Sequence, residues 1–494
     1  MKKIIIIFIG ILAVNVLFTA CEKEFLDTYP TDQVSSNSAV LTTDNAMTAL
    51  NGIHRALYVR YGSQGRGGIG AFYIHIDEAG EDFVSPVSNW TTSYKWIPNY
   101  DPTDAYNTAN WAMFYQWIAN ANVLINGVDA AEGEQADKDA IKGEALLYRA
   151  WGHYQLVQLY GNRYNKGGGN SQLGIPIKID NASDPIVRST VEEVYTQINS
   201  DIDDAIVLLD GYSRRNKSHF DASVAKGLKA RVALTQGNWS TAATFAAQAR
   251  SGYSLMSQET YAQGFSIGSE ANSEFMWASQ IVADQSDLFG NYGAYISRNF
   301  SSSAIRANPR AISSLLYPMI SDTDVRKTLW DPTGLHLNLP DGVSLLSTHK
   351  KFPYTSQKFI AVSNADSRVD VPNMRAAEMY LIEAEALARS NQDGPAALAL
   401  YNLVISRDDA YTLSSNTGTA LIDEIMVQRR VELWGEGFRW YDLKRLNLPL
   451  DRTGSNQTVA VAGFMEVPVG DNKWTWPIPQ DEMDANNLMV QNPI

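Results

Sequence analysis

Two separate stretches of the chain carry the same pattern, in which two short amphipathic segments are joined by a tight turn. The first, DASVAKGLKARVALTQGNWSTAATFAAQARSGY, spans residues 221–253 and turns at the Gly-Asn pair 237–238. The second, VPNMRAAEMYLIEAEALARSNQDGPAALALYNLVISR, spans 371–407 and has Asp-Gly-Pro at 393–395 as its predicted turn. Helical pairs with small residues at their contacts are typical of tetratricopeptide-type repeats. The first stretch has small residues where its helices would touch: Ala225, Ala230, Ala233, Ala242 and Ala246. Both stretches are therefore predicted to be hairpins of a degenerate repeat.

Four further segments have helical periodicity or helix-capping residues. TTDNAMTALNGIHRALYVRYG has Thr43 or Asp44 as its predicted N-cap, and STVEEVYTQINSDIDDAIVLLDG has Ser189 or Thr190. DKDAIKGEALLYRAWGHYQLVQLYG is predicted to end at Gly161. NTANWAMFYQWIANANVLIN carries four aromatic residues that we expect in the core: Trp111, Phe114, Tyr115 and Trp117.

The predicted fold class is mainly α, a tetratricopeptide-like helical-hairpin scaffold with large loop-rich insertions. Long irregular segments inside a compact domain are usually functional or disordered, and the aromatic content of these insertions argues against disorder. We expect one domain over residues 41–494. Its expected parts are a helical scaffold at about 41–250 and 371–446, ligand-binding insertions at about 62–104 and 255–370, and an irregular C-terminal segment at 447–494.

The first 20 residues have the pattern of a secretory signal peptide, because Lys2 and Lys3 precede an apolar run over residues 4–18. The run is shorter than the roughly 20 residues that a membrane-spanning helix needs. Phe-Thr-Ala-Cys, ending at Cys21, is similar to a bacterial lipobox, so Cys21 is predicted to be the lipidated N-terminus of the mature chain. Residues 21–40 are predicted to form a polar tether.

Composition excludes some classes of function. Cys21 is the single cysteine of the chain, so no intrachain disulfide can form. The formal net charge of -14 argues against nucleic acid and polyanionic substrates. The chain also has 24 Tyr and 12 Trp, a surplus that packing or ligand binding must explain.

The stretch RRVELWGEGFRWYDLKR, residues 429–445, has the charge density of an active site. Glu432 and Glu436 would share a helix face at about 6 Å between Cβ atoms, which passes a crude distance test for the carboxylate pair of a glycoside hydrolase. Opposite charges at i,i+3 would lower the pKa of these carboxylates, whereas a general acid needs a raised pKa. The expected pairs are Arg429–Glu432, Glu436–Arg439 and Asp442–Arg445. We therefore predict an ion-paired brace that ties the last scaffold helix to its neighbours.

Other short motifs are weak. GRGGIG at residues 65–70 matches a dinucleotide-binding pattern but lacks the preceding strand, so we interpret it as a flexible loop and predict no cofactor. No pair among the six histidines has the spacing of a zinc protease, and no metal site is predicted. His75 and Asp77 begin an acidic cluster for which a loosely bound Ca²⁺ is conceivable, but a solvated acidic loop is the favoured interpretation.

Two aromatic segments are the better candidates for a binding site. Sugars present apolar C–H faces and a rim of hydroxyl groups, so their sites combine flat aromatic rings with hydrogen-bonding side chains. SNWTTSYKWIPNYD and DLFGNYGAYISRNF provide both kinds of residue. The predicted ligand-binding residues are Trp90, Trp96, Asn99, Tyr100, Tyr292, Tyr295 and Trp330.

The chain resembles the SusD/RagB family of outer-membrane nutrient-binding lipoproteins of Gram-negative bacteria. Six segments in the correct order carry the resemblance: CEKEFLD, ALLYRAWGHYQLVQLYG, AKGLKARVALTQGNW, MRAAEMYLIEAEALAR, RRVELWGEGFRWYDLKR and WPIPQDEMDANNLMVQNP. The resemblance implies a helical fold on tetratricopeptide-like pairs, with loop-rich insertions that build a ligand surface. It also implies a TonB-dependent transporter partner of the SusC type, over which the lipoprotein sits as a lid. Glu22, Glu24 and Asp27 are like the surface-export signals of such lipoproteins.

The leading functional hypothesis is a non-enzymatic, surface-exposed lipoprotein that captures an oligosaccharide or polysaccharide and delivers it to the transporter. A peptide ligand is the alternative within the family. Two alternatives from other classes stay open: an all-helical glycoside hydrolase and a scaffold that only stabilises the transporter.

Overall fold

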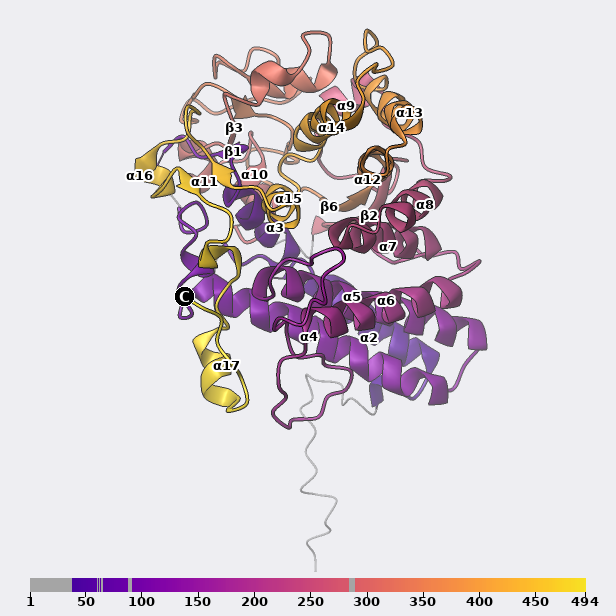
Figure 1. Ribbon diagram of the computed structural model, residues 1–494. Helices are drawn as coiled ribbons and strands as arrows, with labels where there is room; N and C mark the ends of the chain where they lie inside the picture. The colour runs from indigo at the N-terminus through magenta and orange to yellow at the C-terminus, as the bar shows by residue number, and fades with distance from the viewer. Residues whose placement is uncertain (1–37, 60, 62, 64, 88–90, 284–288) are drawn as a thin grey trace, which may run out of the picture.

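The computed structural model describes residues 38–494 apart from 60, 62, 64, 88–90 and 284–288 (Figure 1). The predicted signal peptide, Cys21, most of the predicted tether and Trp90 lie outside the described residues. Among the described residues, no helix combines the length and the apolar character that a membrane crossing requires.

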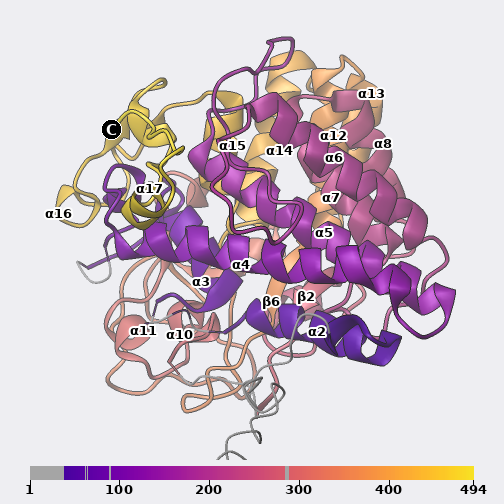
Figure 2. The same cartoon turned by 90° about the horizontal axis from the view of Figure 1, so that it is seen from below.

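The N-terminal half of the scaffold is a stack of long helices, as expected for a mainly α fold. Helices α4 (Ala105–Gly127) and α5 (Gln135–Tyr160) pack side by side, and α6 (Val191–Leu208) packs on α5. Helix α2 (Thr43–Ala56) packs against both α4 and α5. Figure 2 shows α4 running across this side of the molecule with α2 beside it. The stack gives the rest of the chain a rigid base.

Both predicted hairpins are present and lie next to each other. Helices α7 (Ala222–Gln236) and α8 (Trp239–Ala249) form the first, and α12 (Ala376–Arg389) and α13 (Asp393–Val404) form the second. Gly237 has φ +70°, a left-handed conformation that lets α7 end and the chain reverse. Helix α8 packs on α12, so two hairpins far apart in sequence form one layer (Figure 1).

The turn of the second hairpin lies earlier than predicted. It spans residues 390–392, where Asn391 adopts φ +59°, and Asp-Gly-Pro at 393–395 forms the first turn of α13 instead. Proline is tolerated there because the first helical N–H groups have no partner within the helix. Helix α14 (Gly418–Glu432) then packs against α12 and α13, around a small apolar cluster of its own.

Helix ends follow the capping residues closely. Thr42, one residue before the predicted caps, accepts a hydrogen bond from the Asn45 N–H at the start of α2. Thr190 caps α6 and exchanges hydrogen bonds with Glu193 in a capping box. Gly161 follows the last residue of α5, as predicted.

The predicted loop at 65–70 is wrong in part, because helix α3 (Gly68–Glu78) begins inside it. The helix is buried on nearly all sides, so its sequence lacks the polar face that gives an amphipathic period. The element before it is α2 and no strand, in agreement with the rejected dinucleotide motif. Strand β1 (Phe83–Val84) follows α3.

Residues 255–370 contain only short elements. Strands β1, β3, β5 and β4 form an antiparallel sheet in that order, so the first insertion pairs directly with the second. Strand β2 pairs with β6, which leads into α12. The short helices of this region are α9 (Gln258–Ala262), α10 (Gly293–Ile296), α11 (Ser303–Ala307) and the 3₁₀ helices Tyr317–Met319 and Val325–Leu329. Its strands are β2 (Phe275–Ser279), β3 (Ala311–Ile312), β4 (Trp330–Asp331) and β5 (Thr355–Ser356), with β6 (Val371–Arg375) at its end.

The C-terminal segment returns to the long helices. Asn107 of α4 donates to the Pro477 carbonyl (2.9 Å), and Asn492 donates to the Tyr160 carbonyl of α5 (2.8 Å). Figure 1 shows this segment as a yellow strip along one edge of the molecule. Its elements are α15 (Arg439–Leu446), β7 (Leu450–Asp451), α16 (Val459–Ala462), β8 (Glu466–Val467), the 3₁₀ helix Asn472–Trp474 and α17 (Gln480–Ala485).

The predicted aromatic core of α4 is confirmed. Phe114 and Trp117 are fully buried and Trp111 almost so, whereas Tyr115 is partly buried. Trp117 stacks on Trp151 of α5 with ring centroids 5.4 Å apart. These rings join α4 and α5 at the centre of the main core.

Candidate ligand-binding site

The charged stretch 429–445 forms the end of α14, a turn and α15. Glu432 is the last residue of α14, and Glu436 lies in the turn, so the two carboxylates do not share a helix face. The Glu432 carboxylate accepts hydrogen bonds from three guanidinium groups, those of Arg326 (3.1 Å), Arg375 (2.9 Å) and Arg407 (3.2 Å). Burial alone would raise the pKa of Glu432, but the three arginines hold it well below its usual value.

Glu436 belongs to the same buried charge network. Its carboxylate binds Lys358 (2.7 Å) and Arg375 (2.7 Å), and Arg375 also reaches Glu274 (2.5 Å). We use the name charge network for these residues: Glu274, Arg326, Lys358, Arg375, Arg407, Glu432 and Glu436. The basic side chains of the network come from the insertion 255–370, from β6 and from the loop after α13. The network therefore fastens those three parts to the end of α14. It has no exposed carboxylate that could protonate a glycosidic bond.

The brace is therefore present, but most of its predicted pairs are wrong. Only Asp442–Arg445 forms as expected (2.8 Å), while Arg429 binds Asp442 across the turn (2.8 Å). Arg439 binds Glu81 of the first insertion. Spacing along one helix could not reveal this, because the helix breaks at the two glycines of the turn, which adopt positive φ.

The acidic cluster that follows His75 is buried, which corrects the prediction of a solvated loop. Asp77 accepts hydrogen bonds from the Gly437 and Phe438 N–H groups (3.0 and 3.1 Å), and Asp82 binds Arg430 (2.5 Å). Burial raises the pKa of Asp77 to about 7, although the backbone hydrogen bonds act to lower it. Asp77 and Asp82 therefore hold the brace through buried contacts.

The structure places most of the predicted ligand-binding side chains in the interior. Trp96 is fully buried, its indole N–H donates to the Ala79 carbonyl (2.8 Å), and its ring packs against Trp474 (4.8 Å between centroids). Asn99 is 3% exposed and donates to the Lys473 carbonyl (3.0 Å). In this conformation neither side chain has surface to offer a ligand.

The second predicted patch is also buried. The Tyr292 hydroxyl donates to the Gly435 carbonyl (2.5 Å). The Tyr295 hydroxyl donates to the Phe289 carbonyl (2.8 Å), and Trp330 packs edge-on against Trp434 (5.7 Å between centroids). These three rings therefore belong to the packed interior of the insertions.

Two aromatic side chains of the predicted segments do reach the surface. Tyr100 is 38% exposed and Phe289 is 45% exposed. They come from the two different insertions, and Trp90, between β1 and Tyr100, lies outside the described residues. Among the described aromatic residues of the two segments, these two offer the most ring surface for stacking on a sugar.

The two insertions meet near Phe289, whose carbonyl accepts the Tyr295 hydroxyl. The Gly65 N–H donates to the Tyr295 hydroxyl (2.5 Å), and a side chain at Gly70 would collide with the Tyr292 ring. At this contact the structure has a cavity of about 20 Å³, which we call the junction cavity. Ten residues line it: Gly65, Ala71, Ile74, His75, Glu78, Thr92, Ser93, Tyr106, Tyr295 and Arg310.

The junction cavity is polar but too small for a sugar ring. Its volume corresponds to about one water molecule. Burial and the nearby charge of Arg310 lower the pKa of His75 to about 3, so its ring is neutral, and burial raises the pKa of Glu78 to about 7. The cavity itself therefore excludes any ligand larger than about one water molecule.

A larger groove of about 500 Å³ lies between the loop after α5, the end of α15 and the C-terminal segment. Amide side chains are frequent in its wall: Asn162, Asn165, Gln172, Asn447, Asn472 and Asn492. Its one large ring, Trp474, is only 8% exposed and packs on Trp96 and Trp440. The groove offers hydrogen bonds without a free aromatic face.

Comparison with known proteins agrees with this architecture. A family model described as "Starch-binding associating with outer membrane" matches residues 25–234, and one described as "SusD family" matches residues 337–494. A SusD-like protein of Formosa agariphila is 24% identical over 383 residues, which is 67% of this chain and 68% of the relative. A second SusD-like protein of the same organism is 33% identical over 130 residues, 24% of this chain and 25% of the relative.

Solved structures have the same fold. A SusD-like carbohydrate binding protein from Bacteroides vulgatus superposes with a TM-score of 0.78 and 26% identity, over 91% of this chain and 97% of the other. A SusD superfamily protein from Bacteroides thetaiotaomicron superposes with a TM-score of 0.77 and 25% identity, over 92% of this chain and 100% of the other. A laminarin binding SusD-like protein superposes with a TM-score of 0.68 and 20% identity, over 92% of this chain and 99% of the other. With two models of one family matching successive parts of the chain, and with structures of that family matching nearly all of it, the protein belongs to the SusD/RagB family.

Proposed function

We propose that the protein is a cell-surface lipoprotein that captures an oligosaccharide or polysaccharide and delivers it to a SusC-like TonB-dependent transporter in the outer membrane. The observation that carries the proposal is the exposure of two rings, Tyr100 of the first insertion and Phe289 of the second. The charge network fixes the second insertion to the helical scaffold, and Asp77 and Glu81 bind the first insertion to the brace. Rigid elements that hold exposed aromatic side chains reduce the entropy lost when a flexible glycan binds.

The relatives support a carbohydrate ligand. The first family model is described as starch-binding, one matching structure is called a carbohydrate binding protein, and another a laminarin binding protein. Starch and laminarin are both glucans, so glucans are the first ligands to test. The lipid anchor rests on the lipobox-like sequence at Cys21, and the acids after it support surface export.

Catalysis is not part of the proposal. The Glu432 carboxylate is ionised and bound by arginines, whereas a general acid must hold a proton near neutral pH. Every carboxylate of the charge network is buried. The protein would bind and release its glycan unchanged.

The first test is a binding screen. Residues 22–494, which include every described residue, are run in native gels that contain starch, laminarin or other polysaccharides. We expect retardation on at least one glycan. If no glycan retards the protein, the same preparation is titrated with peptide mixtures, and peptide binding would replace the glycan in the proposal. No binding of either class would contradict capture and favour the scaffold role.

The transporter partnership has its own test. The full chain is tagged at its C-terminus and expressed in a Gram-negative host that carries SusC-like transporters, and outer membranes are solubilised in mild detergent. We expect a β-barrel transporter to co-purify with the full chain. A Cys21→Ala variant should no longer be found in the membrane fraction. If it remains there, lipid anchoring is contradicted.

A further inference from the structure

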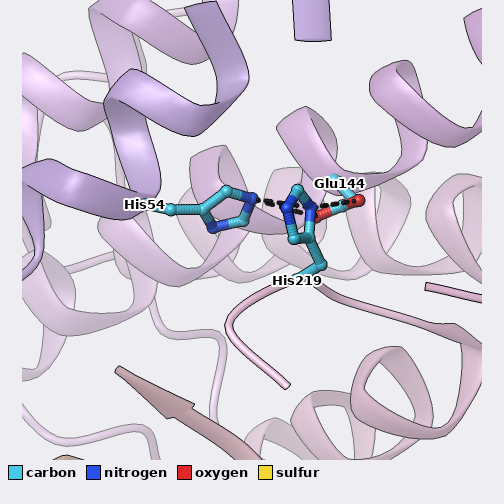
Figure 3. Close-up of side chains that lie close together, drawn as sticks. All are labelled: His54, Glu144 and His219. Atoms are coloured by element: carbon cyan, nitrogen blue, oxygen red, sulfur yellow. Dashed lines mark hydrogen bonds and ion pairs between the residues drawn. The ribbon is translucent and has the colours of Figure 1, made fainter. Parts of the chain in front are cut away.

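Three buried side chains from separate parts of the chain converge between helices of the stack and the segment that leads into α7 (Figure 3). His54 lies on α2, Glu144 on α5, and His219 in the segment that leads into α7. Figure 3 shows both imidazole rings and the carboxylate directed toward one another. Their exposed fractions are 7%, 0% and 4%. Sequence spacing does not reveal this cluster, because His54 and Glu144 are 90 residues apart and Glu144 and His219 a further 75.

The three ligand atoms form a small triangle. His54 Nε2 lies 3.0 Å from His219 Nδ1 and 3.3 Å from Glu144 Oε2. His219 Nδ1 lies 3.0 Å from Oε1 and 3.1 Å from Oε2 of the same carboxylate. A point about 2 Å from all three groups therefore exists, which is the length of a zinc bond to nitrogen or oxygen.

Hydrogen bonds alone do not satisfy this triangle. Each of the two ring nitrogens carries at most one proton, and a carboxylate carries none when ionised. If both ring nitrogens carry a proton, their two N–H groups face each other. If one of them carries none, its lone pair faces the lone pairs of the ionised carboxylate. At least one of the three contacts is therefore unfavourable in either state. A cation at the centre would accept a lone pair from every corner.

The atoms behind the triangle are arranged as the outer shell of a metal site is. The second nitrogen of His54, Nδ1, is bonded to the Tyr148 hydroxyl, which leaves Nε2 directed at the cluster. Glu144 accepts the Phe220 N–H (3.0 Å) and lies within 3.4 Å of the Tyr212 hydroxyl. Metal-binding histidines and carboxylates usually have such partners, which fix their orientation.

We propose that His54, Glu144 and His219 bind one divalent transition-metal ion, with zinc as the first candidate. Two imidazole nitrogens and a carboxylate are a ligand set that such ions prefer. The second carboxylate oxygen is placed to serve as a fourth ligand, because His219 Nδ1 is almost equally far from both oxygens. The ion would clamp α2 and α5 to the chain entering the first hairpin, and its role would be structural.

Zinc content tests the proposal directly. Residues 22–494 are purified without a polyhistidine tag, incubated with ZnCl₂, desalted and measured by mass spectrometry of the metal. We expect about one zinc per chain in the wild type and less than about 0.1 in His54→Gln and His219→Gln. His153→Gln is the matched control, because His153 is also buried in α5 but hydrogen-bonds Lys178 elsewhere. It should retain the ion.

Thermal unfolding provides a second readout. Chelation should lower the melting temperature of the wild type by several degrees and leave His54→Gln unchanged, because an ion bound only by the folded state stabilises it. If the variants fail to fold, Co²⁺ added to wild-type protein should give a visible absorption band that Zn²⁺ removes. A wild type without zinc or Co²⁺ uptake, or a His54→Gln variant that keeps the full ion, would overturn the proposal.

Discussion

Trp96 illustrates how a residue can satisfy the sequence pattern of a ligand site and still belong to the core. The pattern of tryptophan, asparagine and tyrosine in a loop is the same for both roles, since large aromatic side chains are buried on average. What decides is the partner: the indole N–H meets the Ala79 carbonyl, and Trp440, Phe464 and Trp474 surround the ring. These partners lie elsewhere in the sequence, so the sequence alone could not separate the roles.

Replacing Trp96 and Tyr100 should therefore have opposite consequences. We expect Trp96→Ala to lower the free energy of unfolding by about 3–5 kcal/mol, because it empties a buried volume. Tyr100→Ala should change it by about 0.5 kcal/mol or less, as exposed positions do. Urea denaturation of residues 22–494 measures both. A Trp96→Ala protein of wild-type stability that no longer binds glycan would restore Trp96 as a ligand contact.

Asp442 should make stability depend on pH in acid. Burial would raise its pKa, but Arg429 and Arg445 lower it to about 2, below the value in the unfolded chain. Because the folded-state pKa is depressed, its contribution of about 2 kcal/mol is present above pH 4 and is lost as the pH falls toward 2. The stability difference between wild type and Asp442→Asn should shrink over that range. A difference that is independent of pH would contradict the ion pairs.

At the scale of elements, the charge network is the main device that joins the parts of the fold. It links β6, the long insertion and the end of α14 through Arg375, which contacts three carboxylates. The arginines and acids at 429–445 predicted a brace, and a brace is present. The partners Arg326, Lys358, Arg375 and Arg407 could not be predicted, because tertiary folding brings them in from other elements.

Removing Arg375 should cost far more than removing an exposed arginine. We expect Arg375→Met to destabilise by about 3–5 kcal/mol, because it leaves buried carboxylates unpaired. Arg368→Met is the matched control, since Arg368 pairs with Asp366 near the surface, and it should destabilise far less because exposed ion pairs contribute little to stability. Chemical denaturation of both variants gives the comparison. Equal effects would show that the network does not hold the insertions.

The helical hairpins were predictable and α3 was not, for one physical reason. Helix α6 exposes a polar side and begins at a capping box, and α7 begins at a capping aspartate and ends at Gly237, so the period of α6 and the ends of both helices are visible in the sequence. Helix α3 is enclosed by other elements, and its residues are apolar on nearly every side. A fully buried segment loses the periodic signal on which such predictions depend.

At the scale of the whole molecule, the helical stack supports irregular insertions whose contacts are mostly internal. The family and the mainly α fold could be recognised from six sequence segments. Tyr100 is among the predicted ligand-binding residues, but the sequence could not distinguish it and Phe289 from the buried Trp96, Tyr292 and Trp330, because burial separates these rings only after folding. Composition can indicate which segment contains a binding site, but only the tertiary structure shows which of its side chains are exposed.

The hydrolase alternative makes a distinct prediction for the whole molecule. Long incubation with each bound polysaccharide should release no reducing sugar, because the acids at 432 and 436 are occupied by arginine and lysine. Reducing-end assays with and without protein measure this. Release that disappears in a Glu432→Gln or Glu436→Gln variant that remains folded would show catalysis at the brace.

The most direct measurement is calorimetric titration of the glycan that retards the protein, using wild type and two variants. Tyr100→Ala/Phe289→Ala removes the exposed rings of the insertions, and Leu398→Ala removes an exposed apolar side chain of α13 as the control. We predict that the double variant loses at least about 10-fold in affinity, since each ring contributes about 1 kcal/mol, while the control binds like wild type. Unchanged affinity in a folded double variant would contradict glycan capture at the exposed rings.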